Sequence, residues 1–223
     1  SDTINFTGGV VATAPSAISL GGALTTNSGA VTLGGSTKTV TLVGTSSSIN
    51  TAYSGNGAAI TISGPVQGTS DGAESLSVSS KTATISLSGI IGSSIKLGTL
   101  TLGDASQTGA ITVNGTIVAD NLAVGASTGS NAFNVALNNI ASAAGTTTIS
   151  SGATFYNTGT LRLGDNYNDI FNFLGGVTAN ASSGISINVS QINATASAIS
   201  LNSPTTIENS VTLSPGVGRI TLG

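Results

Sequence analysis

The side chains that could take part in chemistry are few, and the densest group of them lies in one short loop. Asp165, Asn166, Asn168 and Asp169 could present several oxygen atoms from that loop, and such oxygens are the ligands that Ca²⁺ prefers. The related segment Gly103–Gln107 keeps few of these ligands, whereas calcium-binding repeats recur in tandem. The pattern therefore favours a turn built on Asx side chains, with a calcium site as the alternative.

Two close pairs of acidic residues could in principle cleave a glycosidic bond, which requires two carboxyl groups that flank it across a groove. The pairs are Asp71 with Glu74 and Asp165 with Asp169, and each falls in a predicted turn. The chain contains no His and no Cys, which removes the commonest general base and the thiol nucleophile. We therefore expect no enzymatic activity and no cofactor. A monomeric carbohydrate-binding or carbohydrate-cleaving protein is the competing class.

The composition limits the kinds of partner. Charged residues make up only 6% of the chain, the net charge is −3, and no run of basic residues occurs, so nucleic acid is not an expected partner. No apolar run approaches the roughly 18 residues of a membrane-spanning helix. The 31 glycines and the abundance of Thr, Val and Ile favour strands and turns over helices.

A three-residue pattern of apolar, small polar, apolar recurs along the whole chain. Alternation of this kind places both apolar side chains on one face of a short strand. Successive copies are mostly nine to sixteen residues apart, and Gly, Asn, Ser or Asp ends each one. The clearest copies are Ile18–Leu20, Val31–Leu33, Val40–Leu42, Ile60–Ile62, Leu76–Val78, Ile85–Leu87, Leu100–Leu102, Ile111–Val113, Ile185–Ile187, Ile199–Leu201, Val211–Leu213 and Ile220–Leu222. The sequence therefore predicts an all-β protein.

Among all-β architectures, a parallel β-helix (a β-solenoid) fits best. The apolar positions are nearly all Val, Ile or Leu, which stack in columns, and Asn and Thr recur where ladders between coils could form. At about 20 residues per coil the chain would form on the order of ten coils and a rod about 50 Å long. We expect one domain over residues 1–223, assumed right-handed from the usual hand of parallel crossovers. A β-sandwich fibre subunit, whose N-terminal strand completes a neighbour's sheet, is the alternative.

Self-similarity supports the solenoid. Residues 2–12 align with residues 169–179, with identical Asp, Asn, Phe, Gly, Gly, Val and Ala residues at matching positions. The alignment puts Phe6 and Phe173 at equivalent positions, and with Phe171 they are predicted to fill the core. Only residues 131–145 read partly as a helix, with Gly145 as a possible cap, and further strand is the alternative there.

Residues 111–122 (Ile-Thr-Val-Asn-Gly-Thr-Ile-Val-Ala-Asp-Asn-Leu) and residues 185–213 resemble the repeats of filamentous-haemagglutinin-like, β-strand-repeat bacterial exoproteins. The resemblance implies a parallel β-helix in a secreted or cell-surface adhesin. The absence of Cys from this chain is a further similarity to that family. An extracellular structural or adhesive role in attachment and biofilm, with host or cell-surface glycans as possible partners, is what the resemblance implies. It carries over no catalytic residues.

The two ends of the sequence read as apolar and uncapped, so we expect copies to stack head to tail into a fibre. The residues predicted to form this contact are Ile4, Phe6, Val10, Val217, Ile220 and Leu222. Five Asn-x-Ser/Thr sequons could carry glycans on a surface protein. They begin at Asn5, Asn114, Asn180, Asn188 and Asn193.

Overall fold

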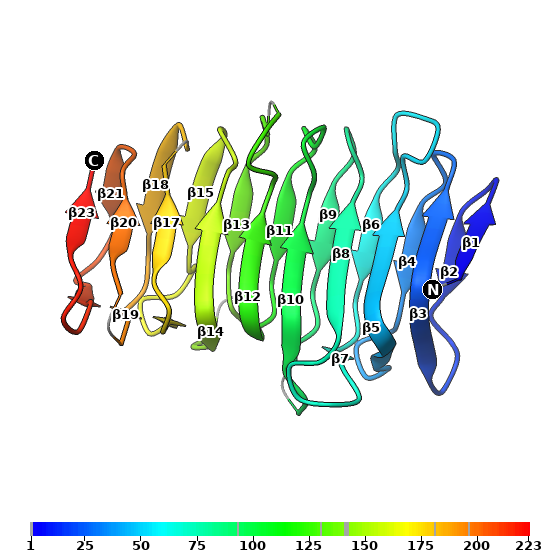
Figure 1. Cartoon of the computed structure of the whole chain (residues 1–223), viewed down its shortest axis with the longest axis horizontal. Helices are drawn as coiled ribbons and strands as arrows, with labels where there is room; N and C mark the ends of the chain where they lie inside the picture. The colour runs from blue at the N-terminus through cyan, green and yellow to red at the C-terminus, as the bar shows by residue number, and fades with distance from the viewer. Residues whose placement is uncertain (1, 93, 130, 141–142, 181, 196) are drawn as a thin grey trace.

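The chain winds into a parallel β-solenoid of about nine turns, which confirms the predicted fold and overturns the β-sandwich alternative (Figure 1). The computed structural model describes residues 2–92, 94–129, 131–140, 143–180, 182–195 and 197–223. These residues form a 14-stranded sheet and a 9-stranded sheet, and neighbouring strands run parallel in both. No helix in the described part of the chain is long and apolar enough to cross a membrane.

The 9-stranded sheet, here the short sheet, takes one three- or four-residue strand from each turn. Its inward positions are the Val, Ile and Leu residues of the recurring pattern. Its strands are β2 (Val10–Ala12), β4 (Val31–Leu33), β6 (Ile60–Ile62), β9 (Ile85–Leu87), β11 (Ile111–Val113), β13 (Val135–Leu137), β15 (Thr160–Leu163), β18 (Gly184–Ile187) and β21 (Thr205–Ile207).

The 14-stranded sheet, here the long sheet, is bent into two limbs. In some turns one strand runs through both limbs, and its pairing register shifts at the bend, as between Leu20 and Gly22 of β3. In other turns two separate strands form the limbs. The strands are β1 (Thr3–Phe6), β3 (Ile18–Thr26), β5 (Val40–Asn50), β7 (Val66–Gln67), β8 (Ser75–Ser79), β10 (Leu97–Leu102), β12 (Val118–Val124), β14 (Thr146–Phe155), β16 (Ile170–Phe173), β17 (Val177–Ala179), β19 (Gln191–Asn193), β20 (Ile199–Leu201), β22 (Thr212–Ser214) and β23 (Ile220–Leu222).

The limb that comes first along the chain, the first limb, includes β7, β16, β19 and β22. The second limb includes β1, β8, β10, β17, β20 and β23. Each turn therefore passes from the short sheet to the first limb, then to the second limb, and back to the short sheet. This order places three faces around one core.

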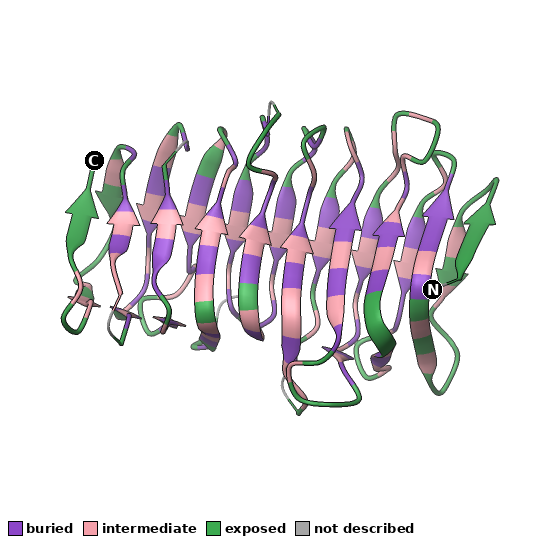
Figure 2. Ribbon diagram, in the orientation of Figure 1, coloured by how far each residue is buried: buried purple, intermediate pink, exposed green. Residues whose placement is uncertain are grey.

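The core consists of columns of apolar side chains, mostly aliphatic, that run along the solenoid axis. Buried residues are purple on the strands in Figure 2. One unbroken column on the second limb begins at Ile4 and ends at Leu222. Between them it passes through Leu24, Ile49, Val78, Leu102, Val124, Phe155, Ala179 and Leu201. Because a coil can bury its apolar face only against itself and its neighbours, each column holds several coils together.

Phe171 and Phe173 fill the core as predicted, with ring centroids 5.5 Å apart and no exposed surface. Phe6 does not, because it lies on the edge strand β1 with 40% of its surface exposed. The prediction that Phe6 is a core residue is therefore wrong. Its cause is the position of β1, which has a neighbouring strand on one side only.

The sequence similarity between residues 2–12 and 169–179 does not correspond to a structural repeat. In the first copy, β1 lies on the second limb and β2 on the short sheet. In the second copy, β16 lies on the first limb and β17 on the second limb. The similar sequences thus span different corners of the solenoid, because the register of each copy is set by the neighbouring coil with which it pairs.

Residues 131–145 contain strand β13 and, among the described residues, no helix. Val135 and Leu137 point inward and pair with Ile111 and Val113, so pairing between coils overrides the helical propensity of the alanines. The strand alternative is confirmed for β13 and the helix alternative is wrong, while residues 141–142 lie outside the described part. The N–H of Gly145 caps no helix but donates to Asp169 Oδ1 at 2.9 Å.

Gly8 and Gly175 are equivalent in the sequence alignment but not in the structure, which gives a matched test of the fold. A Cβ atom on Gly175 would lie 1.9 Å from the carbonyl oxygen of Ser151 in the preceding coil, whereas one on Gly8 would meet nothing within 4 Å. We expect Gly175→Ala to lower the free energy of unfolding by roughly 1–3 kcal/mol through this overlap. Gly8→Ala should change it by less than about 0.5 kcal/mol. Urea denaturation measures both, and equal effects would contradict the arrangement of coils described here.

Candidate functional site

The loop at residues 165–169, predicted as an Asx-type turn with a calcium site as the alternative, is organised around the buried carboxylate of Asp169. Its Oδ1 accepts the N–H of Gly145, and its Oδ2 accepts the N–H groups of Asp165 and Asn166, both at 3.2 Å. Asn166 Oδ1 in turn accepts the N–H of Asn168 at 3.0 Å. Both carboxylate oxygens of Asp169 thus close the turn and join it to the preceding coil. This is the Asx-type turn that the sequence favours, and calcium at this loop stays a prediction.

Burial also affects the charge of Asp169. The side chain has no exposed surface, and desolvation raises the pKa of its carboxyl group above the ordinary 3.8, although the three N–H donors act in the opposite direction. Among the described residues, no group of three or more His, Cys, Asp and Glu side chains is placed to hold a metal ion.

The other pair of acids, Asp71 and Glu74, is also engaged in the loop that precedes β8. Glu74 is buried, and its carboxylate accepts the Thr69 hydroxyl and the N–H of Ser70. The Thr69 hydroxyl bond holds the pKa of Glu74 below its ordinary value. Asp71 Oδ1 accepts the N–H of Lys96 at 3.0 Å, and the Lys96 ammonium pairs with Asp120 at 2.8 Å. These groups tie the loop to the next coils.

The residues predicted to form contacts between copies lie at the two ends of the solenoid. At one end Ile4 is 56% exposed, and at the other Val217 is 90% exposed. Phe6, Ile220 and Leu222 are also exposed, and Val10 is half-buried. Ile207 is not among the contact residues predicted from the sequence, although it is exposed at the end of the short sheet's column that contains Ile187. The spacing of the recurring pattern could have found it, but Thr205 occupies the first apolar position of that copy.

Four of the five sequon asparagines take part in side-chain ladders between neighbouring coils. Asn114 Oδ1 accepts an amide hydrogen from Asn138 at 2.9 Å, and Asn188 Oδ1 accepts one from Asn209 at 2.7 Å. Asn180 accepts in the same way from Asn202, and the Asn193 amide donates to Asn172. Asn5 is exposed on β1. Glycosylation at these positions stays a prediction.

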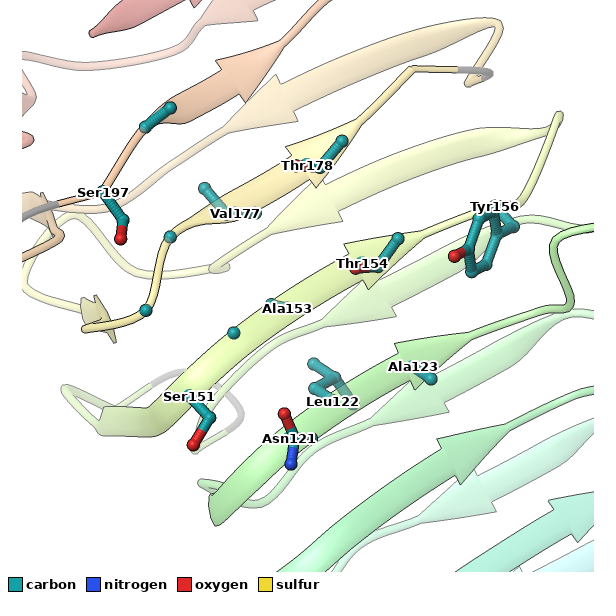
Figure 3. A pocket seen from close by; sticks show the side chains of 14 residues that line it. Asn121, Leu122, Ala123, Ser151, Ala153, Thr154, Tyr156, Val177, Thr178 and Ser197 are labelled. Carbon is teal, nitrogen blue, oxygen red and sulfur yellow. The ribbon is translucent and has the colours of Figure 1, made fainter. Parts of the chain in front are cut away.

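A groove that the sequence did not predict lies where the long sheet bends (Figure 3). It has a volume of about 560 Å³ and crosses β12, β14 and β17 before it reaches the residues that precede β20. Gly152, Gly175 and Gly176 form part of its floor, so backbone replaces side chains there. A smaller hollow of about 490 Å³ occurs at the same bend near β3 and β5. Both hollows follow from the bend of the long sheet.

The lining of the larger groove is polar but uncharged. Its described lining residues include no Asp, Glu, Lys or Arg, and Tyr156 is the one aromatic residue among them. Figure 3 shows Tyr156 at one side of the groove and Ser151 and Asn121 at the other. In the described part of the chain, no protein group forms a hydrogen bond with the side chains of Asn121, Ser151, Thr154, Thr178 or Ser197.

Comparison with known proteins gave no match to a family model, to a curated protein or to a solved structure.

Asp169 gives a direct test of the buried turn. In Asp169→Asn, the amide NH₂ must face either the N–H of Gly145 or the N–H groups of Asp165 and Asn166. At least one buried donor then loses its acceptor, so we expect a loss of roughly 1–3 kcal/mol in unfolding free energy by urea denaturation. Asp104→Asn is the control, because the carboxylate of half-buried Asp104 accepts only from Ser106 in a local turn. A similar loss in both variants would contradict this role for Asp169.

The raised pKa of Asp169 also predicts a pH dependence. Since the folded state favours the protonated carboxyl, the resulting stabilisation is complete below pH 3.8 and is lost as the pH rises through the folded pKa. We therefore expect the unfolding free energy of the wild type minus that of Asp169→Asn to fall with rising pH above 3.8. Parallel denaturation series in buffers of increasing pH measure this difference. A difference that grows with pH would contradict the raised pKa.

Proposed function

We propose that this protein is a structural unit of an extracellular fibre or large surface adhesin, and that its solenoid stacks head to tail with copies of itself. The observation that carries this proposal is the column from Ile4 to Leu222, which reaches both ends of the solenoid with its terminal side chains exposed. An exposed strand edge next to apolar side chains is a template for another strand. A second copy offers matching apolar positions.

The strand register defines how two copies would meet. The column of Ile4 continues through Leu222 when β1 of one copy pairs with β23 of the next. Thr3 of one copy then lies beside Thr221 of the next, because both belong to the outward row adjacent to that column. The two ends also carry opposite exposed charges, Asp2 near β1 and Arg219 before β23. This complementarity favours head-to-tail over head-to-head contact.

The same register predicts that the junction is the weakest part of the fibre. At the C-terminal end all three faces finish with a strand, namely β21, β22 and β23. At the N-terminal end β1 adds to the second limb alone. Pairing β1 with β23 therefore leaves a gap one strand wide between β21 and β2 and another between β22 and β3. Ile207, in β21, borders the gap between β21 and β2.

The composition and the outer surface support a passive, extracellular role. The chain has no Cys, few charges and short ladders of neutral side chains, so neighbouring rods repel one another little. The resemblance of residues 111–122 and 185–213 to bacterial β-strand-repeat adhesins points in the same direction.

Cysteine cross-linking tests the junction, because the native chain contains no Cys. In Thr3→Cys/Thr221→Cys the two thiols lie at opposite ends of one molecule and can meet only between copies. We expect oxidation to give a ladder of covalent oligomers on a non-reducing gel, since paired strands place Cα atoms within the range of a disulfide. Electron microscopy of the same sample should show filaments with an axial spacing of about 4.8 Å.

Thr61→Cys/Thr221→Cys is the matched control, because Thr61 faces outward from the middle of the short sheet and cannot reach Thr221 of a stacked copy. It should remain uncross-linked. Single particles at high protein concentration would contradict self-stacking. Filaments in which Thr3→Cys and Thr221→Cys do not cross-link would contradict the proposed register alone.

A further inference from the structure

The groove at the bend of the long sheet is a candidate binding site that neither self-stacking nor the sequence analysis accounts for. Some outward polar side chains elsewhere on the solenoid bond to one another between coils, as Asn172 does with Thr148 and Asn193 does with Asn172. Inside the groove the corresponding polar groups have no protein partner in the described part of the chain. Their hydrogen-bonding capacity is therefore open to a ligand.

The shape of the groove is fixed by the packing of the coils. Gly175 must lack a Cβ because of its contact with Ser151, and a Cβ on Gly176 would lie 2.9 Å from the carbonyl oxygen of Ala198. Together with Gly152 of the preceding coil, these glycines keep the floor free of side chains across two neighbouring coils. A volume of about 560 Å³ lies within the range of small-molecule sites. A ligand would thus find a preformed surface.

The chemistry of the lining selects an uncharged ligand rich in hydroxyl groups. Ser151, Thr154, Thr178 and Ser197 offer hydroxyls that donate and accept, and Asn121 offers an amide that does both. Tyr156 adds an aromatic ring with a polar end. The nearby Asp120 is neutralised by its ion pair with Lys96 at 2.8 Å. No charged side chain is therefore available in the lining for a sulfated or carboxylated ligand.

The direction of the groove adds a constraint on length. Asn121, Ser151 and Ser197 lie in different coils, so the groove runs across the strands and along the solenoid axis (Figure 3). Each coil along the groove contributes at least one polar side chain, and neighbouring coils are about 4.8 Å apart, with Gly175 in the row between Ser151 and Ser197. A hexopyranose unit in an extended oligosaccharide has a similar length. A short glycan could place one sugar over each coil.

We propose that the groove lined by Asn121, Ser151, Thr154, Tyr156, Thr178 and Ser197 binds a neutral oligosaccharide, with the glycan chain along the solenoid axis. The sugar hydroxyls bond to the Ser, Thr and Asn side chains, and one ring packs against Tyr156. This inference does not depend on head-to-tail stacking, because every lining residue belongs to a single molecule.

Tyrosine fluorescence gives a specific test, since the chain has three Tyr residues and no Trp. In the Tyr53→Phe/Tyr167→Phe background, emission reports on Tyr156 alone, and neither replaced residue lines the groove. Titration with maltohexaose, cellohexaose and mannohexaose should give a saturable change in emission with at least one of them. A heparin-derived hexasaccharide should give none.

Substitutions in the same background test whether the oligosaccharide binds in the groove. Ser151→Arg and Thr178→Arg each lay a long side chain across the groove, and each should weaken binding at least tenfold. Thr32→Arg, which faces outward from β4 on the short sheet, is the matched control and should leave the affinity unchanged. Circular dichroism confirms that each variant is folded.

The proposal is overturned if none of the three neutral hexasaccharides changes Tyr156 emission at millimolar concentration, or if only the acidic probe does. It is also overturned if Ser151→Arg and Thr178→Arg bind as tightly as the Thr32→Arg control. Neither outcome bears on fibre formation, which the cross-linking experiment measures separately.

Discussion

In-register pairing between one coil and the next is the interaction on which the rest of this structure depends. A single coil has inward-facing Val, Ile and Leu residues on three short faces, which is too little apolar surface to stabilise it alone. Pairing converts these positions into continuous columns, such as the one that joins Ile4 to Leu222. The same pairing lines up Asn114 with Asn138 and Asn188 with Asn209 on the outside. The apolar columns inside and the Asn ladders outside therefore both result from in-register strand pairing.

Strand pairing between coils does not determine the conformation of the residues at the bend of the long sheet. Pairing fixes the residues on either side of the bend, while the residues between them vary from coil to coil. In one part of the molecule the bend is occupied by the loop that holds Glu74 and, in the next two coils, by the Lys96–Asp120 ion pair. In another part it is lined by Gly152, Gly175 and Gly176 and becomes a groove. The surface of the solenoid thus differs most between coils at the bend, where the residues are least constrained by strand pairing.

The period-two alternation was sufficient to predict the strands and the solenoid. In each triplet, such as Ile111–Val113, the two apolar residues face the core and the polar residue between them faces outward. The same pattern does not indicate on which face of the solenoid a strand lies or with which coil it pairs. For that reason the similarity between residues 2–12 and 169–179 misled, and Phe6 was assigned to the core although it lies at an edge. The Asp169 turn was foreseen as local Asx chemistry, but its bond to Gly145 in the preceding coil was not.

The groove was not predicted at all. It depends on close approach between backbones of successive coils, such as Gly175 over Ser151, and glycine in a sequence rich in glycine does not distinguish a turn from such a contact. Its lining residues also come from different coils, so no local motif connects Asn121 with Ser197.

The short distance along the chain between paired residues has a consequence for how this protein forms. Most side-chain bonds between coils join residues 21 to 31 positions apart, as for Ser190 with Asp169 and Asn139 with Ile170. The Arg162–Glu208 pair, 46 positions apart, is an exception. Loop closure therefore costs about the same entropy for each added coil, instead of growing with the length of the chain. Folding can begin at any completed coil and propagate toward either end, as in other one-dimensional arrays. A chain that emerges gradually from a narrow export channel would then be able to fold coil by coil, before its last residues have appeared.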